Sequence, residues 1–557
     1  MIAGLLFADK DWNHIKKYDD EKTIIDDLHL NTIFRVSAQK VIWKKGSVER
    51  VTGADPFIEQ TMRRVIMAPL RTKEEVEYRQ AVIKDFLKVP ELAEELYELT
   101  TKLKNVWEAM GRNGKKHQEQ DAAGEMITNI KVINMLLNTL CTVRSKLEEK
   151  KDNFSSEGLN NLIARINEEL TEDKEKRIRK VLDDLSFYVL GEEREEKMKA
   201  GRICVPEIVL GCRIGDALRF DSFKLEELQS LDKKFHKPGG ILSKMDDYKN
   251  KLVPDSIQLA KNPKLLDQGA YMERMMVRYL CESLNGFVDE IGAFFDQLQM
   301  QSAFMTGVCF LQDQMRRYSM SLTFPKVGEK QSYKFKELME LVMCLEQHMV
   351  PVGNTCEIKD KNMLVVTGAN QGGKSTFLRS IGIAQILLQA GMPVLADEYE
   401  APLYPGMFTH FTRREDSEMN SGRLDEELKR MSQIVDYLRK NEEEAPGTSL
   451  VLLNESFATT TEKEGSVIAY DILQAMTQMG VNVATVTHLL TFAKRLYEEK
   501  EQEKKDKGIQ ETNVVFLSAE RLDSGERTYR MIPCVPQLTS FGLDLYDRMI
   551  LGKDAET

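Results

Sequence analysis

The stretch TGANQGGKST, residues 367–376, fits the pattern G-x-x-x-x-G-K-[ST] without a gap. Glycines let successive backbone N–H groups turn inward around phosphate oxygens, in conformations that a side chain would obstruct. Within such a loop, Lys374 is expected to reach the terminal phosphates and the Ser375 hydroxyl to coordinate magnesium. The residues expected to bind the nucleotide are Gly368, Gly372, Gly373, Lys374, Ser375 and Thr376.

The flanking residues predict a strand before this loop and a helix after it. KNMLVV, residues 361–366, has the composition of a short buried strand, and TFLRSIGIAQILLQAG, residues 376–391, has helical spacing. The dipole of a helix favours an anion at the helix N-terminus. A glycine-rich turn that merely joins strand to helix is the alternative, but the complete motif in this context favours binding of ATP with Mg²⁺.

Length and composition bound the kind of protein. A chain of 557 residues is too long for one core and should form about two to four domains. Acidic residues exceed basic ones by 11, so the net charge does not indicate a nucleic-acid-binding protein. A local basic face is still compatible with this net charge. The eight cysteines form no C-x-x-C pair, and no apolar run approaches the roughly 18 residues that a membrane helix needs. We therefore expect a cytoplasmic protein without a membrane partner.

The first half of the chain has mainly helical patterns. Residues 55–150 are dense in Glu, Leu, Lys and Met at helical intervals, which predicts several antiparallel helices. RICVPEIVLGCRIGDALRF, residues 202–220, is richer in Val, Ile and Gly and predicts a short sheet or mixed segment. Apolar residues then recur at three- and four-residue steps; a continuous helix over 264–319 would span roughly 80 Å. Packing against another helix explains this stripe better than a cofactor site does.

From about residue 330, strand-like runs alternate with helices, which predicts an α/β domain with a mostly parallel sheet. The runs are MLVVTG (363–368), PVLAD (393–397), SLVLLNE (449–455), VNVATVTH (481–488), NVVFLSAE (513–520) and RTYRMIP (527–533). EEKEQEKKDKGIQE, residues 498–511, has mixed charges and is interpreted as a solvated insert.

Two of these strands end in polar residues that complete a nucleotide site. Glu455 follows a buried strand and is our candidate for polarising the attacking water. Asn454 occupies the place where Asp is usual; it is able to hold Mg²⁺ through a bound water but adds no negative charge, which leaves the hydrolysis rate open. His488, at the exit of another strand, is either structural or a contact to the γ-phosphate. Glu455, His488 and Lys374 are the predicted catalytic residues, with Ser375 and Asn454 at the metal.

Taken together, residues 367–398, SLVLLNESFATTTEKEGSVIAYDIL (449–473), TVTHL (485–489) and SFGLDL (540–545) resemble the ATPase domain of MutS-family DNA mismatch repair proteins. Residues 61–92 resemble the start of that family's helical core, and the long helix resembles its lever arm. The resemblance implies an ABC-type P-loop ATPase that forms a homodimer with composite ATP sites. It gives phosphate, magnesium, catalytic-base and phosphate-sensing roles, in that order, to Lys374, Ser375, Glu455 and His488, and a place in the phosphate loop to Asn370.

The chain departs from the family pattern in four places. Residues 1–54 are too few for the family's mismatch-reading and connector domains, and no nuclease-like tail follows the ATPase, so we expect a short, divergent member. Leu424 and Asp425 stand where the partner-contacting signature has Ser and Thr, which removes a hydroxyl donor to the partner's γ-phosphate. Residues 457–459, Phe-Ala-Thr, replace the usual Gly-Arg-Gly.

The expected organisation is a short N-terminal segment (1–54), an all-α core and lever region (55–329), and the α/β P-loop ATPase domain (330–557). By resemblance, a small mixed clamp-like insert over 180–265 would grip DNA. Its lysines and arginines are interleaved with acids. A solvated helix face would show the same mixture, so the residues themselves leave DNA contact open.

The leading hypothesis is an ATP-dependent DNA-binding protein of MutS type that closes its levers on DNA during repair. Mismatch recognition is implied by the family alone. The alternative is a non-catalytic or slow ATP-gated scaffold acting on a protein or RNA partner, which Asn454, Leu424, Asp425 and the acidic balance favour. A small-molecule kinase is disfavoured because the helical half is so large.

Overall fold

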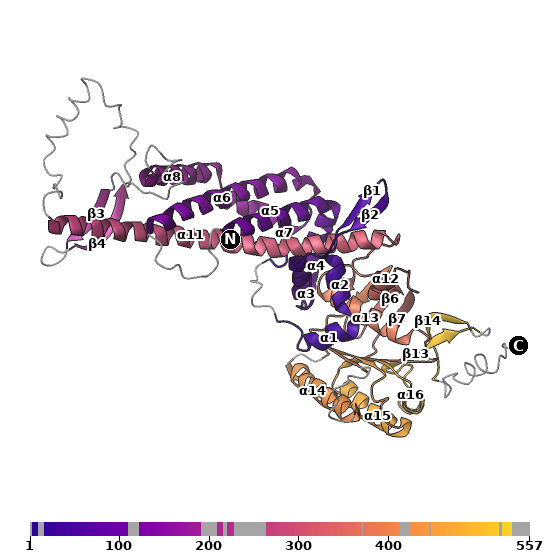
Figure 1. Ribbon diagram of the computed structural model, residues 1–557. Coiled ribbons are helices and arrows are strands. Elements are labelled where there is room, and N and C mark those ends of the chain that lie inside the picture. The colour runs from indigo at the N-terminus through magenta and orange to yellow at the C-terminus, as the bar shows by residue number, and fades with distance from the viewer. Residues whose placement is uncertain are drawn as a thin grey trace, which may run out of the picture. The chain divides into compact units, whose positions relative to one another are not determined.

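The computed structural model describes residues 3–8, 16–109, 122–190, 209–214, 220–227, 263–369, 371–412, 423–444, 447–522 and 526–536. The chain forms two compact units, each described here by itself (Figure 1). Unit 1 comprises Met1–Ala3, Glu95–Asp152 and Asn161–Gln299, and unit 2 comprises Gly4–Glu94, Asn153–Asn160 and Met300–Thr557.

Unit 1 is built mainly from long helices and one hairpin. The elements wholly in unit 1 are α6 (Ala122–Glu149), α8 (Glu172–Leu190), β3 (Val209–Ile214) and β4 (Phe220–Glu227). Unit 1 also holds most of α5 (Pro90–Ala109) and α7 (Glu157–Glu169), whose first residues belong to unit 2, and the first part of α11 (Pro263–Arg316). The predicted long helix is present as α11, with 54 residues, and it begins at a proline, which the first helical turn tolerates. The strands β3 and β4 pair antiparallel, which confirms the predicted mixed segment near residue 202.

Side chains join the helices of unit 1 at their ends. The Arg144 guanidinium of α6 donates to the carbonyl of Leu170, just past α7, at 2.7 Å. The same side chain pairs with Glu175 of α8 at 3.1 Å. A guanidinium is well suited to this position because the last carbonyls of a helix have no partner within the helix. Buried Leu136, Leu140 and Phe294 supply apolar packing for α6 and α11.

One helical stretch among the described residues meets length and composition criteria for crossing a membrane. It is Glu125–Glu149 in α6, whose most apolar window has a mean hydropathy of 1.3. More than half of that window is buried within the protein. A core helix of a helical bundle satisfies the same criteria, because it is apolar over much of its surface.

The N-terminal part of unit 2 contains four helices and a hairpin: α1 (Glu21–Leu28), α2 (Leu30–Ser37), β1 (Val41–Lys44), β2 (Ser47–Val51), α3 (Pro56–Ile66) and α4 (Lys73–Lys88). Local capping explains where two of them start. The Asp55 carboxylate accepts from two backbone N–H groups at the start of α3. Thr72 and Glu75 form a reciprocal capping box at the start of α4.

The larger sheet of unit 2 has six strands in the order β10-β11-β12-β8-β13-β14. The strands are β8 (Met363–Thr367), β10 (Gly406–Phe411), β11 (Ser449–Asn454), β12 (Asn482–Val486), β13 (Val514–Arg521) and β14 (Arg527–Pro533). All neighbouring pairs are parallel except β13 and β14. The predicted α/β architecture with a mostly parallel sheet is thereby confirmed.

Helices cover both faces of this sheet. They are α13 (Lys374–Gln389), α14 (Arg423–Glu444), α15 (Glu462–Gln478) and α16 (Leu490–Lys507). One buried cluster joins β8, β11 and β12 through Val365, Val451 and Val483 to residues of α14, α15 and α16, which gather on one side in Figure 1. A sheet covered on both faces explains why its central strands are buried throughout and mainly apolar.

A second, four-stranded sheet in unit 2 was not predicted. Its order is β5-β9-β6-β7, from β5 (Lys326–Val327), β6 (Tyr333–Leu338), β7 (Asn354–Ile358) and β9 (Glu398–Ala401), with α12 (Leu341–Gln347) between β6 and β7. Lysine and glutamate alternate with apolar residues in β6, which gives a weak signal for a strand.

Two sequence-based expectations were wrong. PVLAD (393–397) is not a strand; within it, Val394 forms an isolated bridge to Thr323. EEKEQEKKDKGIQE (498–511) is not an insert, because its first part continues α16 to Lys507. Ion pairs one turn apart, such as Lys507 with Glu503, replace the apolar periodicity that usually identifies a helix.

Candidate nucleotide-binding site

The loop between β8 and α13 is shaped by glycines that no other residue could replace without strain. Gly368 has a φ of +109°, and a Cβ placed on it would lie 2.7 Å from Ser518 Oγ and 2.9 Å from the Ala519 nitrogen. Gly373, at the N-cap of α13, has a φ of +87°. Both positions are in the region that favours glycine, and Gly368 also lies too close to β13 for any side chain.

Lys374 is folded back onto this loop. Its ammonium group donates to the carbonyls of Gly368 at 2.7 Å and Ala369 at 2.9 Å. Burial lowers the pKa of Lys374 to about 8; the charge of Glu455 opposes this shift, and that of Arg527 adds to it. A phosphate beside Lys374 would favour the charged ammonium form and reverse this shift.

Ser375 and Asn454 meet at the carboxyl end of the sheet. The Ser375 hydroxyl donates to Asn454 Oδ1 at 2.9 Å. The described residues contain no group of three or more His, Cys, Asp or Glu side chains able to hold a metal ion. Mg²⁺ commonly takes one or two protein oxygens and completes its shell with water and phosphate oxygens. The neutral oxygens of Ser375 and Asn454 fit that minimal role.

Glu455 and His488 form a close pair at the ends of β11 and β12. His488 Nε2 lies 2.7 Å from Glu455 Oε1. The hydrogen bond from His488 lowers the pKa of the Glu455 carboxyl, while burial acts in the opposite direction. Glu455 has a φ of 56°, an unusual value for a residue with a side chain. The carboxylate is therefore ionised and held by a specific partner.

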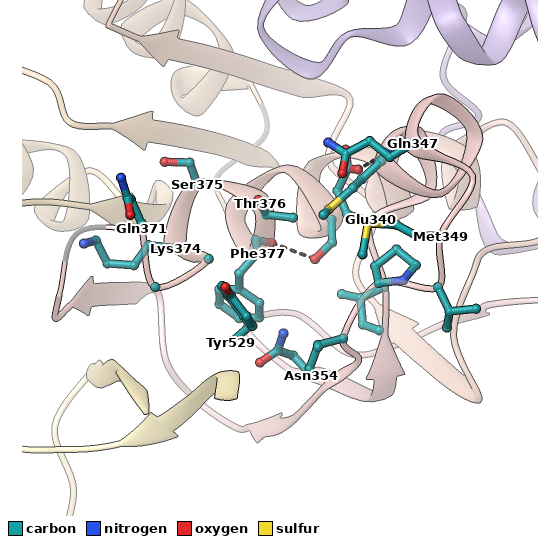
Figure 2. A pocket seen from close by; sticks show the side chains of 18 of the residues that line it. Glu340, Gln347, Met349, Asn354, Gln371, Lys374, Ser375, Thr376, Phe377 and Tyr529 are labelled. Carbon is teal, nitrogen blue, oxygen red and sulfur yellow. Dashed lines mark hydrogen bonds between the residues drawn. The ribbon is translucent and has the colours of Figure 1, made fainter. Parts of the chain in front are cut away.

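These groups line a pocket of about 880 Å³. That volume is in the range that binds small molecules. Figure 2 shows Lys374, Gln371 and Ser375 at one end, Glu340, Gln347 and Met349 at the other, and Tyr529 between them. The apolar part of the lining comes from Leu338, Met343, Met349, Val350, Pro351, Val352, Phe377 and Tyr529. The pocket thus has a polar end at the glycine loop, and an opposite end where apolar side chains predominate beside Glu340 and Gln347.

The structure brings most of the residues that we singled out from the sequence to this pocket. Gly372, Gly373, Lys374, Ser375, Thr376, Glu455 and His488 line it directly. Gly368 contributes through its carbonyl and Asn454 through its bond to Ser375. Asn370 lies outside the described residues, as does most of the expected clamp-like insert over 180–265. Leu424 and Asp425 lie in the first turn of α14.

Sequence reasoning missed several residues around the pocket. Arg527 of β14 donates to Gln371 of the glycine loop at 3.0 Å, and Tyr529 lies beside Gly373. The loop Met349–Val352 supplies the apolar end. No motif marks these residues, because they approach the glycine loop only through the pairing of β14 with β13 and through the second sheet.

Comparison with known proteins relates both halves of the chain to one family. The MutS2 N-terminal domain model matches residues 71–191, and the MutS domain V model matches residues 364–533, which include the pocket's glycine loop, Glu455 and His488. A DNA mismatch repair protein MutS from Petrotoga mobilis is 29% identical over 194 residues, which cover 34% of this chain and 22% of that protein.

Endonuclease MutS2 proteins are also similar. The one from Exiguobacterium sibiricum is 26% identical over 321 residues, which cover 55% of this chain and 37% of the relative. The one from Aquifex aeolicus is 30% identical over 171 residues, which cover 30% of this chain and 21% of the relative. The chain thus matches well under half the length of these curated relatives. Two matching domains and the relatives at low identity show that the chain belongs to the MutS family.

Proposed function

We propose that this protein is an ATP-dependent DNA-binding protein of MutS type, in which ATP binding and hydrolysis close a homodimer and its lever helices on DNA during repair. The observation that carries the proposal is the convergence of Lys374, Glu455 and His488, which all lie within the match to domain V, on one pocket. Binding of ATP with Mg²⁺ would supply the phosphoryl group and a Lewis acid at this pocket.

Each residue has a distinct part in this proposal. Lys374, released from the Gly368 carbonyl, would bind the terminal phosphates, and backbone N–H groups of the glycine loop would bind the remaining oxygens. Ser375 and Asn454 would hold Mg²⁺, Asn454 through water. The ionised Glu455 carboxylate would accept a proton from the attacking water, and His488 would hold Glu455 and contact the γ-phosphate.

The apolar end of the pocket fits a purine base. Met349, Val350 and Val352 are exposed, at 47%, 55% and 41%, although they are large apolar side chains. Such exposure is unfavourable unless a ligand or partner covers it. A base placed there would remove this surface from water while its phosphates reach the glycine loop.

The proposed DNA binding and dimer formation rest on membership of the MutS family. One relative is named a DNA mismatch repair protein and two are named endonucleases. In the proposed layout, residues 330–557 are the ATPase domain, residues 55–329 the core and lever with an insert over 180–265, and 1–54 a short N-terminal segment. The protein would act in the cytoplasm, without a membrane partner.

A non-catalytic or slow ATP-gated scaffold for a protein or RNA partner is the second candidate. Asn454 favours it, because an uncharged residue beside Ser375 binds Mg²⁺ more weakly than a carboxylate would. Leu424 and Asp425 favour it as well, because neither supplies the hydroxyl expected of a composite site.

Nucleotide titration and steady-state hydrolysis test the proposal. The parent protein should bind ATP and hydrolyse it with Mg²⁺; Lys374→Ala should lose binding, and Glu455→Gln should bind without turnover. Lys359→Ala is a control, because its side chain is 72% exposed and pairs only with the Glu357 carboxylate among the salt bridges described. ATP binding without turnover would support the scaffold. Absence of nucleotide-dependent dimer closure in small-angle scattering would count against lever closure.

A further inference from the structure

The loop that follows β11 carries the Glu455 carboxylate in an unusual backbone conformation. Glu455 has a φ of 56° and Phe457 a φ of 65°, and neither is a glycine. Left-handed conformations are unfavourable for residues with a Cβ and persist where the surroundings hold them. Residues 455–459, here called the carboxylate loop, must therefore be fixed by contacts from elsewhere in the fold.

Two contacts hold the start of the carboxylate loop. The Glu455 N–H donates to the carbonyl of Val486 in β12 at 2.8 Å. The Thr412 hydroxyl, just after β10, donates to the Glu455 carbonyl at 2.8 Å. These bonds fix the peptide groups on both sides of Glu455 against the sheet.

The middle of the loop packs against His410. The Ser456 hydroxyl lies 2.7 Å from His410 Nδ1, and the Phe457 ring stacks on the imidazole with centroids 6.0 Å apart. Both His410 and Phe457 are buried. These contacts place the two side chains but leave the backbone N–H of Phe457 to another partner.

That partner is Glu427, in the second turn of α14. Its Oε2 accepts from the Phe457 N–H at 3.0 Å and from the Thr459 hydroxyl at 3.1 Å. Glu427 is only 6% exposed and does not line the nucleotide pocket. One carboxylate oxygen thus bridges two residues of the carboxylate loop from a helix that is distant in sequence.

Burying an acid at this place has a desolvation cost that its hydrogen bonds must offset. Burial raises the pKa of the Glu427 carboxyl, while the hydrogen bonds from Thr459 and Phe457 and the charge of Arg430 oppose the rise. An apolar residue would pack beside α14 without this desolvation penalty. The benefit of the carboxylate is conformational, since it accepts two hydrogen bonds that an apolar side chain would leave unmade.

We propose that Glu427 is a positioning residue for hydrolysis, which anchors the carboxylate loop to α14 and thereby fixes the direction of the Glu455 side chain. This inference rests on the proposed role of Glu455 in ATP hydrolysis. Together with the bonds from Glu455 to Val486 and from Thr412 to Glu455, this anchor keeps the carboxylate loop in the conformation in which Glu455 meets His488.

Four variants separate positioning from packing. Glu427→Gln keeps one side-chain oxygen for the two donors, whereas Glu427→Ala removes it. Leu438→Ala, at a fully buried position of the same helix, controls for lost stability. Asp436→Ala, at an exposed acid of α14, controls for lost charge. Each variant is compared with the parent in kcat, KM for ATP, melting temperature and amide hydrogen exchange over residues 455–459.

Glu427→Ala should lower kcat by about tenfold or more with KM changed by less than about threefold, because misplaced catalytic groups lose rate rather than binding. It should also speed amide exchange over 455–459. Glu427→Gln should stay within about threefold of the parent. An equal loss of kcat in Leu438→Ala at matched stability would overturn the inference.

The exchange measurement separates this inference from the proposed function. A parent protein without turnover, or with turnover that survives Glu455→Gln, contradicts the proposed function. Exchange over 455–459 that is the same in Glu427→Ala and the parent contradicts the anchor, whether or not ATP is hydrolysed.

Discussion

Two loops at the carboxyl edge of the same sheet reach a left-handed backbone by different means. The glycine loop has glycines, Gly368 and Gly373, at two of its positive φ angles and Gln371, with a φ of 60°, at a third. The carboxylate loop uses Glu455 and Phe457 instead. The first loop is shaped mainly by its own glycines, with one contact from Arg527 to Gln371. The second is held by Thr412, His410 and Glu427 from other elements. Local residues specify most of the glycine loop, whereas tertiary contacts specify the position of the proposed catalytic carboxylate.

The largest expected effect is on the carboxylate loop. Glu455→Gln should lower kcat by about 100-fold or more, because a general base typically contributes that much. ATP affinity should change little, since Lys374 and the glycine loop remain. Steady-state hydrolysis and equilibrium binding measure the two quantities separately. A loss of affinity with kcat unchanged would show that Glu455 serves binding rather than the chemical step.

In the glycine loop, replacing a glycine should destabilise the protein because the backbone conformation becomes strained. Gly368→Ala combines a φ of +109° with a Cβ 2.7 Å from Ser518 Oγ, so it should lower the free energy of unfolding by about 3 kcal/mol. Gly508→Ala is the matched control, because Gly508 has a φ of +62° with nothing within 4 Å of its Cβ. That control should cost about 1 kcal/mol. Urea unfolding of both variants measures the loss of unfolding free energy in each. Equal losses would mean that the close packing of Gly368 on β13 does not contribute to stability.

The affinity for ATP should depend on pH through the charge of Lys374 in the glycine loop. Burial lowers the pKa of Lys374 to about 8, so the ammonium is increasingly neutral above that pH in the free protein. Bound phosphate favours the charged form, and ATP binding should therefore take up a proton and weaken by roughly tenfold between pH 8 and pH 9.5. Lys374→Arg should bind with little dependence on pH over this interval, because arginine stays charged. A parent affinity that is flat with pH would contradict a lowered Lys374 pKa.

The smallest effect is expected from one anchor bond of the carboxylate loop. Thr459→Val removes the hydroxyl that donates to Glu427, which should cost about 1 kcal/mol of unfolding free energy. Thr460→Val removes a neighbouring hydroxyl that donates to exposed Glu464 and should cost about 0.5 kcal/mol or less. Thermal unfolding of both variants measures the two losses of unfolding free energy. Identical losses would mean that the buried hydrogen bond to Glu427 contributes no more than the exposed one to Glu464.

The sequence predicted the parts of the site that depend on neighbours along the chain. A buried strand, a glycine motif and a helix lie in one stretch, so β8, the loop and α13 could be anticipated from residues 361–391. The strands β11 and β12 were recognisable because strands covered on both faces are mainly apolar.

The rest depends on contacts between residues far apart in the sequence. Glu427 lies 30 residues before Phe457 and Arg527 lies 156 residues after Gln371, so no local pattern marks either pair. The charged half of α16 lacks apolar periodicity, and PVLAD has strand composition without a strand partner beyond one bridge. Composition misleads where tertiary pairing decides the conformation.

DNA binding measured by fluorescence anisotropy tests the central claim most directly. Duplex, mismatched, branched and single-stranded DNA would be titrated at two salt concentrations, with and without ATP, beside Lys374→Ala. The proposal predicts an affinity that falls as salt rises and that changes with ATP in the parent but not in Lys374→Ala. No binding to any of these DNAs by a protein that still binds ATP would contradict a DNA clamp and favour the scaffold for a protein or RNA partner.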